Sequence, residues 1–140
     1  MAIIDKPSDY FETKLYTGNG GTQSITGLDF QPNWVWIKDR DDTFKHILVD
    51  SVRGATKHLA SSSSAAEITN TANVTSFTSD GFALSSDGNV NANADKYASW
   101  NWKESATAGF DIVSYSGTGS AKTVSHNLGV KPDVIICKSR

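Results

Sequence analysis

The chain has 140 residues and a formal net charge of −2, so it is long enough to bury one sizeable hydrophobic core. Its balanced charges give no basic stripe for nucleic acid, and no apolar run approaches the roughly 20 residues that a membrane-spanning helix needs. The N-terminal residues lack the apolar stretch of a signal peptide, so we expect synthesis in the cytoplasm without export.

The chain contains one segment twice. Residues 11–40 align with residues 110–140 when one residue is inserted. Internal similarity at such long spacing indicates a duplicated supersecondary unit. Each copy is predicted to form three strands, because apolar alternation broken by glycine-rich turns is typical of β-hairpins. Equivalent pairs include Tyr16 and Tyr115, Gly18 and Gly117, Gly20 and Gly119, Ile25 and Val124, Leu28 and Leu128, and Pro32 and Pro132.

Further strands are predicted between the two copies. Phe44–Val49 is rich in β-branched and aromatic residues, and Lys57–Ala60 is predicted to return antiparallel to it. Residues 61–67 are predicted as a serine-rich loop, with a short capped helix as the alternative. The turn Ser79-Asp80-Gly81 separates two strands of a hairpin, and Tyr97–Lys103 alternates as a further strand.

These elements predict an all-β protein with an antiparallel β-sandwich, since about ten short strands are separated by regular turn signals. We divide the chain into an N-terminal attachment arm (residues 1–10), a β-sandwich domain (11–104) and a partial second repeat (105–140). The partial repeat would supply three strands with an apolar run near its end. Because an uncovered strand of this kind promotes aggregation, we expect it to pack on the first domain or on a neighbouring subunit.

The tryptophans fall in two W-x-W strands. We expect Ala98, Trp100 and Trp102 to face the core, with Ser99, Asn101 and Lys103 facing solvent. Packing in the core is the first interpretation, and a platform that stacks on sugar rings is the alternative. The candidate glycan-binding residues are Trp34, Trp36, Trp100 and Trp102.

One loop carries an oxygen-bearing side chain at every second position, as a calcium site would require. However, Ala92 and Ala98 stand where a helix-loop-helix calcium loop has its glycine and its bidentate glutamate. A solvated loop without any cofactor is therefore the first interpretation, and calcium binding is the alternative. The candidate ligands are Asp87, Asn89, Asn91, Asn93 and Asp95.

No motif predicts an enzyme. The three histidines lack zinc-ligand spacing, no G-x-S-x-G sequence is present, and the glycine-rich turns do not open a helix. Asp50 and Arg53 are interpreted as an ion pair within a turn, and Cys137 as a buried thiol. A polysaccharide depolymerase would need two acidic residues in one groove. The candidates for that role are Asp41, Asp42, Asp50, Asp87 and Asp95.

The combination of YTGNGGTQSITGLDFQPNWVWIKDR, HILVDSVRG, SDGFAL and YASWNWK with a second GFDIVSYSGTG resembles a repeated β-rich domain of marine tailed-bacteriophage virion proteins similar to tail fibres. The resemblance implies a lectin-like or jelly-roll sandwich located in the virion, on the tail or capsid surface. It implies a tail-fibre or surface-appendage subunit involved in assembly and host attachment, and it supplies no catalytic residues. In that family the second copy continues to its own W-x-W strand, which is not found within these 140 residues.

The partners expected from this resemblance are further copies of the chain, with a trimer as the first expectation, and other virion proteins bound through the N-terminal arm. The alternatives are a carbohydrate-binding module for glycans of the host surface and a capsid decoration or fibre protein.

Overall fold

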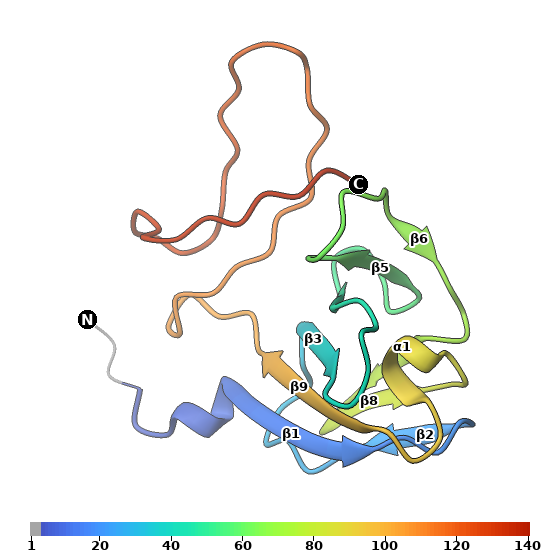
Figure 1. The fold of residues 1–140 in the computed structure, drawn as a ribbon. Helices are drawn as coiled ribbons and strands as arrows, with labels where there is room; N and C mark the ends of the chain where they lie inside the picture. The colour runs from blue at the N-terminus through green and yellow to red at the C-terminus, as the bar shows by residue number, and fades with distance from the viewer. Residues whose placement is uncertain (1–3) are drawn as a thin grey trace.

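The computed structural model describes residues 4–140 and forms two antiparallel sheets (Figure 1). The prediction of an all-β sandwich is confirmed. The six-stranded sheet has the order β1-β9-β3-β4-β5-β6, and the three-stranded sheet has the order β2-β8-β7. The elements are η1 (Pro7–Asp9), β1 (Phe11–Thr17), β2 (Gln23–Ile25), β3 (Trp34–Asp39), β4 (Ile47–Asp50), β5 (Lys57–Ala60), β6 (Ile68–Thr69), β7 (Val74–Thr78), β8 (Gly81–Leu84), α1 (Gly88–Asn91) and β9 (Lys96–Trp102).

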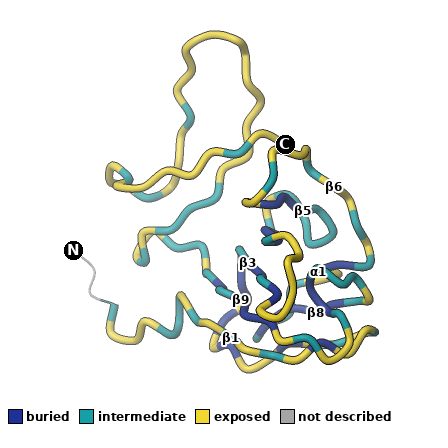
Figure 2. The backbone as a smooth tube through the Cα atoms, viewed as in Figure 1, coloured by how far each residue is buried: buried dark blue, intermediate teal, exposed yellow. Residues whose placement is uncertain are grey.

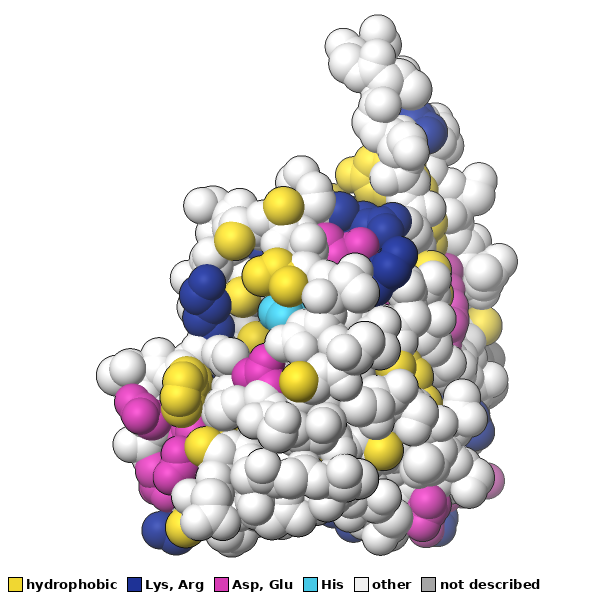
Figure 3. Space-filling view, turned by 90° about the vertical axis from the view of Figure 1, so that its right-hand side faces the viewer, with side chains coloured by type: hydrophobic (Ala, Val, Ile, Leu, Met, Phe, Trp, Pro, Cys, Tyr) yellow, Lys and Arg dark blue, Asp and Glu magenta, His cyan; other side chains and the backbone are white. Residues whose placement is uncertain are grey.

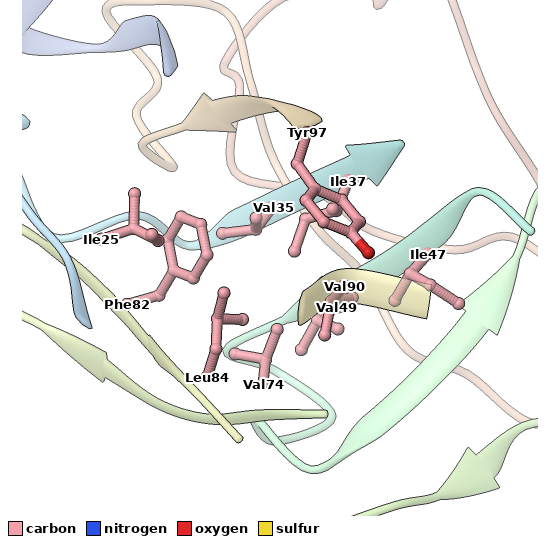
Figure 4. Packing of buried hydrophobic residues seen from close by; sticks show 10 residues of the cluster. All are labelled: Ile25, Val35, Ile37, Ile47, Val49, Val74, Phe82, Leu84, Val90 and Tyr97. Atoms are coloured by element: carbon pink, nitrogen blue, oxygen red, sulfur yellow. The ribbon is translucent and has the colours of Figure 1, made fainter. Parts of the chain in front are cut away.

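The hydrophobic core lies between the two sheets (Figure 4). The large sheet contributes side chains from β3, β4 and β9, the small sheet contributes side chains from β2, β7 and β8, and α1 closes one end. Burial of each of these side chains stabilises the folded state by about 1.5–3 kcal/mol. The core residues are Ile25, Val35, Ile37, Ile47, Val49, Val74, Phe82, Leu84, Val90 and Tyr97.

Strand β9 is an inner strand of the large sheet, because it pairs with β1 on one side and with β3 on the other. Its alternation places Tyr97, Ser99 and Asn101 toward the small sheet, where all three are fully buried. The sequence prediction of the opposite orientation is wrong. Asn101 Nδ2 donates to the carbonyl of Glu12 and to Ser99 Oγ, so the donor group of this buried amide is paired within the core.

The connections follow the sequence predictions closely. β4 and β5 pair antiparallel, although β4 begins at Ile47, three residues later than predicted. The hairpin of β7 and β8 is confirmed, with a register shift between Val74 and Ser76. Residues 61–67 contain no helix and form the predicted loop. Within residues 4–140 the α-helical part is one turn of four residues, so no described helix is long and apolar enough to cross a membrane.

The arm before β1 lies against the loop that follows β2. Lys6 Nζ lies 2.6 Å from a carboxylate oxygen of Asp29, and Ser8 Oγ donates to the same oxygen over 3.5 Å. Hydrogen bonding to Asp29 and to Asp9 raises the pKa of the exposed Lys6 ammonium. Residues 1–3 of the predicted attachment arm lie outside the described residues.

The C-terminal segment forms none of the three strands that its sequence predicts. After an isolated bridge between Ser105 and Phe110, residues 111–140 contain no strand; they loop out from the sandwich, and their end returns to it near β6 (Figure 1). Most of the segment is exposed (Figure 2). Within the described residues no second β9 lies between its counterparts of β1 and β3, so these have no ladder to join there. The exposed large apolar residues of the segment are Val113, Tyr115, Val130, Val134, Ile135 and Ile136.

Candidate functional site

The outer face of the large sheet carries all four tryptophans, on the side opposite the core. Trp34 is directly opposite Trp102 in the ladder, and Trp36 is opposite Trp100. The rings of Trp34 and Trp102 stack with centroids 4.6 Å apart, and those of Trp36 and Trp100 meet edge to face at 6.1 Å. Each tryptophan is half-buried, so the rings shield one another while part of each stays accessible.

Two phenylalanines extend this cluster, and we call the six rings together the aromatic face. Phe11 of β1 packs on Trp102 with centroids 4.9 Å apart. Phe110 lies nearly parallel to Trp34, with an interplanar angle of 10° and a centroid distance of 5.6 Å. Phe11 and Phe110 are equivalent positions of the duplicated segment. Phe110 also stacks on Trp102 with centroids 6.1 Å apart, so the first residue of each copy contacts Trp102.

A histidine adds a polar group at one side of the aromatic face. The indole Nε1 of Trp36 donates a hydrogen bond of 2.9 Å to Nδ1 of His46. Burial lowers the pKa of His46, and the nearby charge of Lys38 lowers it further. The imidazole is consequently neutral near pH 7, as its role as acceptor requires. A face of this kind stacks against apolar surfaces, such as the ring faces of sugars or the side chains of another protein.

The core interpretation of the tryptophans was therefore wrong, and the four residues proposed for glycan contact do lie together. Phe11, Phe110 and His46 also belong to the cluster, although they were not predicted as site residues. Because alternate residues of a strand share one face, the sequence places Phe11, Thr13 and Leu15 on the same face of β1. Phe110 and His46 lie outside any strand, so no periodic pattern reports their position.

The Asx-rich loop uses its side chains for local structure. Asp87 caps α1, because its carboxylate accepts from the backbone amide of Asn89. The same carboxylate also accepts from Asn70 Nδ2. Asn91 is fully buried, accepts from the amide of Asn19 over 2.9 Å, and donates to the carbonyl of Gly21 over 2.7 Å. These bonds join the loop to the first glycine-rich turn.

Asn93 and Asp95 are two further candidate ligands in this loop. Asn93 is exposed, and Asp95 precedes β9. Desolvation raises the pKa of the Asp95 carboxyl, and the charges of Asp39, Asp41 and Asp42 raise it further. In the described part of the chain, no three His, Cys, Asp or Glu side chains are arranged to hold a metal ion. Calcium binding by this loop stays a prediction.

The predicted ion pair of Asp50 and Arg53 is confirmed, and it belongs to a larger network. Arg53 Nε lies 2.5 Å from Asp50 Oδ2, Nη1 lies 3.1 Å from Glu67, and Nη2 donates to the carbonyl of Leu48. Glu67 also binds Arg140 over 2.9 Å, which ties the C-terminal segment to the loop before β6. Figure 3 shows basic and acidic side chains lying against one another on the face that carries β5 and β6.

The remaining chemical candidates are dispersed. His58 is a buried residue of β5, and His126 is exposed in the C-terminal segment. Cys137 is exposed, so its interpretation as a buried thiol is wrong. Its equivalent in the first copy, Ile37, is fully buried, because β4 and β9 flank β3, whereas no strand in the described part of the chain flanks residues 134–138. Of the acidic residues considered for a depolymerase, Asp50 neutralises Arg53 and Asp87 caps a helix.

The chain belongs to a family described as Domain of unknown function (DUF7483), whose sequence model matches residues 6–140. The matched range includes both copies of the duplicated segment. No curated protein and no solved structure matches the chain.

Proposed function

We propose that this chain is a structural subunit of a bacteriophage surface appendage, such as a tail fibre, and that it functions by assembling with further copies of itself. The observation that carries the proposal is the exposure of residues 110–140. The equivalent residues of the first copy are buried (Val35) or half-buried (Trp34 and Trp36), yet Val134, Ile135 and Ile136 are 78%, 72% and 70% exposed. Three adjacent exposed apolar residues of this size are unfavourable for an isolated soluble protein.

Covering this segment would favour association. Burial of one Val or Ile side chain contributes about 1.5–3 kcal/mol, so three of them supply several kcal/mol before the entropic cost of association. Strands with unpaired backbone groups also pair readily with strands of other molecules. The family likeness drawn from the sequence supplies the virion context, and the exposed repeat supplies the reason to self-associate.

The experiment is light scattering coupled to size-exclusion chromatography over a wide range of protein concentration. We expect a mass above that of one chain, rising with concentration. A triple substitution of Val134, Ile135 and Ile136 by serine is expected to shift the mass toward a single chain without changing the melting temperature of the sandwich, because these side chains are exposed. A wild-type chain that remains a monomer throughout would contradict the proposal.

Carbohydrate binding is the second candidate, and the aromatic face is the observation that favours it. Half-buried tryptophan rings held in fixed positions by a sheet suit stacking on the apolar faces of sugars. Titration with bacterial surface polysaccharide should quench tryptophan fluorescence, and Trp34→Ala should weaken the binding. Unchanged fluorescence with a panel of such glycans would contradict this second function.

A further inference from the structure

The N-terminal copy of the duplicated segment (residues 11–40) fits into the rest of the sandwich at specific points. Gly18 lies so close to the α1–β9 connection that a Cβ there would stand 2.1 Å from the carbonyl oxygen of Ala92. Gly20 has φ of +69°, a conformation that favours glycine. Tyr16 donates a hydrogen bond of 2.8 Å to the carbonyl of Val90. These features position the segment on residues 41–104, which we call the acceptor region.

The C-terminal copy (residues 110–140) repeats these same features without using them. Gly117 is equivalent to Gly18, yet a Cβ at Gly117 would meet no atom within 4 Å. Gly119 has φ of +74°, close to the value of Gly20. Tyr115 is equivalent to the half-buried Tyr16 and is 52% exposed. The second copy thus has the sequence required by the acceptor region, but it is not bound there.

The pattern of burial leads to the same conclusion. Val35 of the first copy is fully buried, whereas its equivalent Ile135 is 72% exposed. On the inner side of β1, Lys14 is replaced by Val113, which is at least as suitable for a position facing the core. Val134 and Ile136 stand where the first copy has Trp34 and Trp36, so this difference affects only the outer face of β3. No residue equivalent to a core position of the first copy is charged.

We propose that residues 110–140 of one molecule occupy the acceptor region of a second molecule of this chain, in place of that molecule's residues 11–40. Within residues 4–140 each molecule has two such segments and one acceptor region, so one of the two segments is free to bind another molecule. In the exchanged state residues 110–116 pair with β9, and residues 134–138 lie between β9 and β4. The molecules become linked in a row. This inference rests on the proposed self-assembly and specifies its geometry.

The experiment compares glycine variants of the full-length chain by light scattering and thermal unfolding. In the exchanged state the valine side chain of Gly117→Val would clash with the acceptor region. In the single molecule a Cβ at this position meets no atom within 4 Å. We expect this variant to keep the wild-type melting temperature and to remain a single molecule at concentrations where the wild type associates. Ser120→Val is the matched control, because its equivalent Gly21 has room for a Cβ, 3.8 Å from Asn19 Oδ1. The control should associate as the wild type does.

The reciprocal variant tests the acceptor region. Gly18→Val excludes the first copy, so it should associate at lower concentrations than the wild type, since the second copy then binds without competition. The double variant with Gly117→Val should not fold, because neither copy fits. Association of Gly117→Val that equals the wild type would overturn the exchange while leaving self-assembly in place. A wild type that never associates would overturn self-assembly itself.

Cysteine cross-linking tests the register between two molecules. Leu15 is opposite Ala98 in the ladder of β1 and β9, and the equivalent of Leu15 is Ser114. In a Cys137→Ser background, chains with Ala98→Cys mixed with chains with Ser114→Cys should form a disulfide-linked dimer. Val113→Cys replaces Ser114→Cys in the control, because residue 113 would face the other side of the sheet. Equal cross-linking of both pairs would contradict the predicted pairing.

Discussion

Replacement of Arg53 by methionine would remove the cation that two carboxylates share. The side chains of Arg53 and Asp50 are 7% and 6% exposed, and that of Glu67 is 14% exposed. Arg53 donates to both carboxylates and to the carbonyl of Leu48. Methionine has a similar length and keeps most of the apolar packing, so the change isolates the loss of charge and hydrogen bonds.

The magnitude follows from the burial of the partners. Loss of one member of a buried ion pair costs about 3–5 kcal/mol, because the remaining charge is left without compensation. Glu67 keeps the partly exposed Arg140 as a second partner, so the uncompensated charge is that of Asp50. We therefore expect a decrease in the free energy of unfolding near the lower end, about 3 kcal/mol.

Urea denaturation followed by tryptophan fluorescence measures this change. Arg40→Met is the matched control, since Arg40 is exposed and its substitution should alter the free energy of unfolding by less than about 0.5 kcal/mol. A loss below about 1 kcal/mol for Arg53→Met would refute the reasoning, because it would mean that the network behaves as an exposed ion pair.

Three further outcomes are expected. Asn91→Ala should lower the free energy of unfolding by about 2–3 kcal/mol in urea denaturation, because buried donors and acceptors lose their partner, whereas Asn93→Ala should have little effect. The hydrogen bond from Arg140 lowers the pKa of Glu67, so Glu67 stabilises the fold above its ordinary pKa of 4.5, and this stabilisation is lost as pH falls through the lowered value. Glu67→Gln should therefore lose less stability on acidification, and an unchanged pH profile would argue against the contact. Phe110→Ala should alter tryptophan emission and cost about 0.5–1.5 kcal/mol, and an unaltered spectrum would mean that Phe110 does not stack on the aromatic face in solution.

Much of the fold could be predicted from local sequence patterns. The hairpin of β7 and β8 follows from the turn residues around Asp80 and Gly81, which force the chain to reverse. Strand β9 follows from strict alternation in YASWNWK. The ion pair of Asp50 and Arg53 follows from their spacing in a turn. These features depend on neighbours in the chain, so sequence alone contains the information.

The orientation of β9 could not be predicted in the same way. Alternation fixes which residues share a face, but not which face meets the small sheet. Large aromatic residues favour a core assignment, yet here Ser99 and Asn101 take that side because the Asn101 amide finds the carbonyl of Glu12 on β1. That partner is 89 residues away in sequence. The aromatic face was thus predicted only as an alternative.

The C-terminal segment shows a different limit. Its sequence pattern indicates a tendency to form strands, since the same pattern forms β1 and β3 in the first copy. A strand also requires a partner for its backbone groups, and β9 is already paired on both sides. The duplication therefore predicts what the second copy is able to form, and only the structure reveals that its place is taken.

Hydrogen–deuterium exchange of residues 110–116 and 134–138, measured at increasing protein concentration, tests the central claim most directly. Strand exchange between molecules predicts rapid exchange of these amides at low concentration and slow exchange at high concentration, while Gly117→Val stays rapid throughout. Amides that remain rapid in the wild type at every concentration would contradict the claim that this second copy binds another molecule.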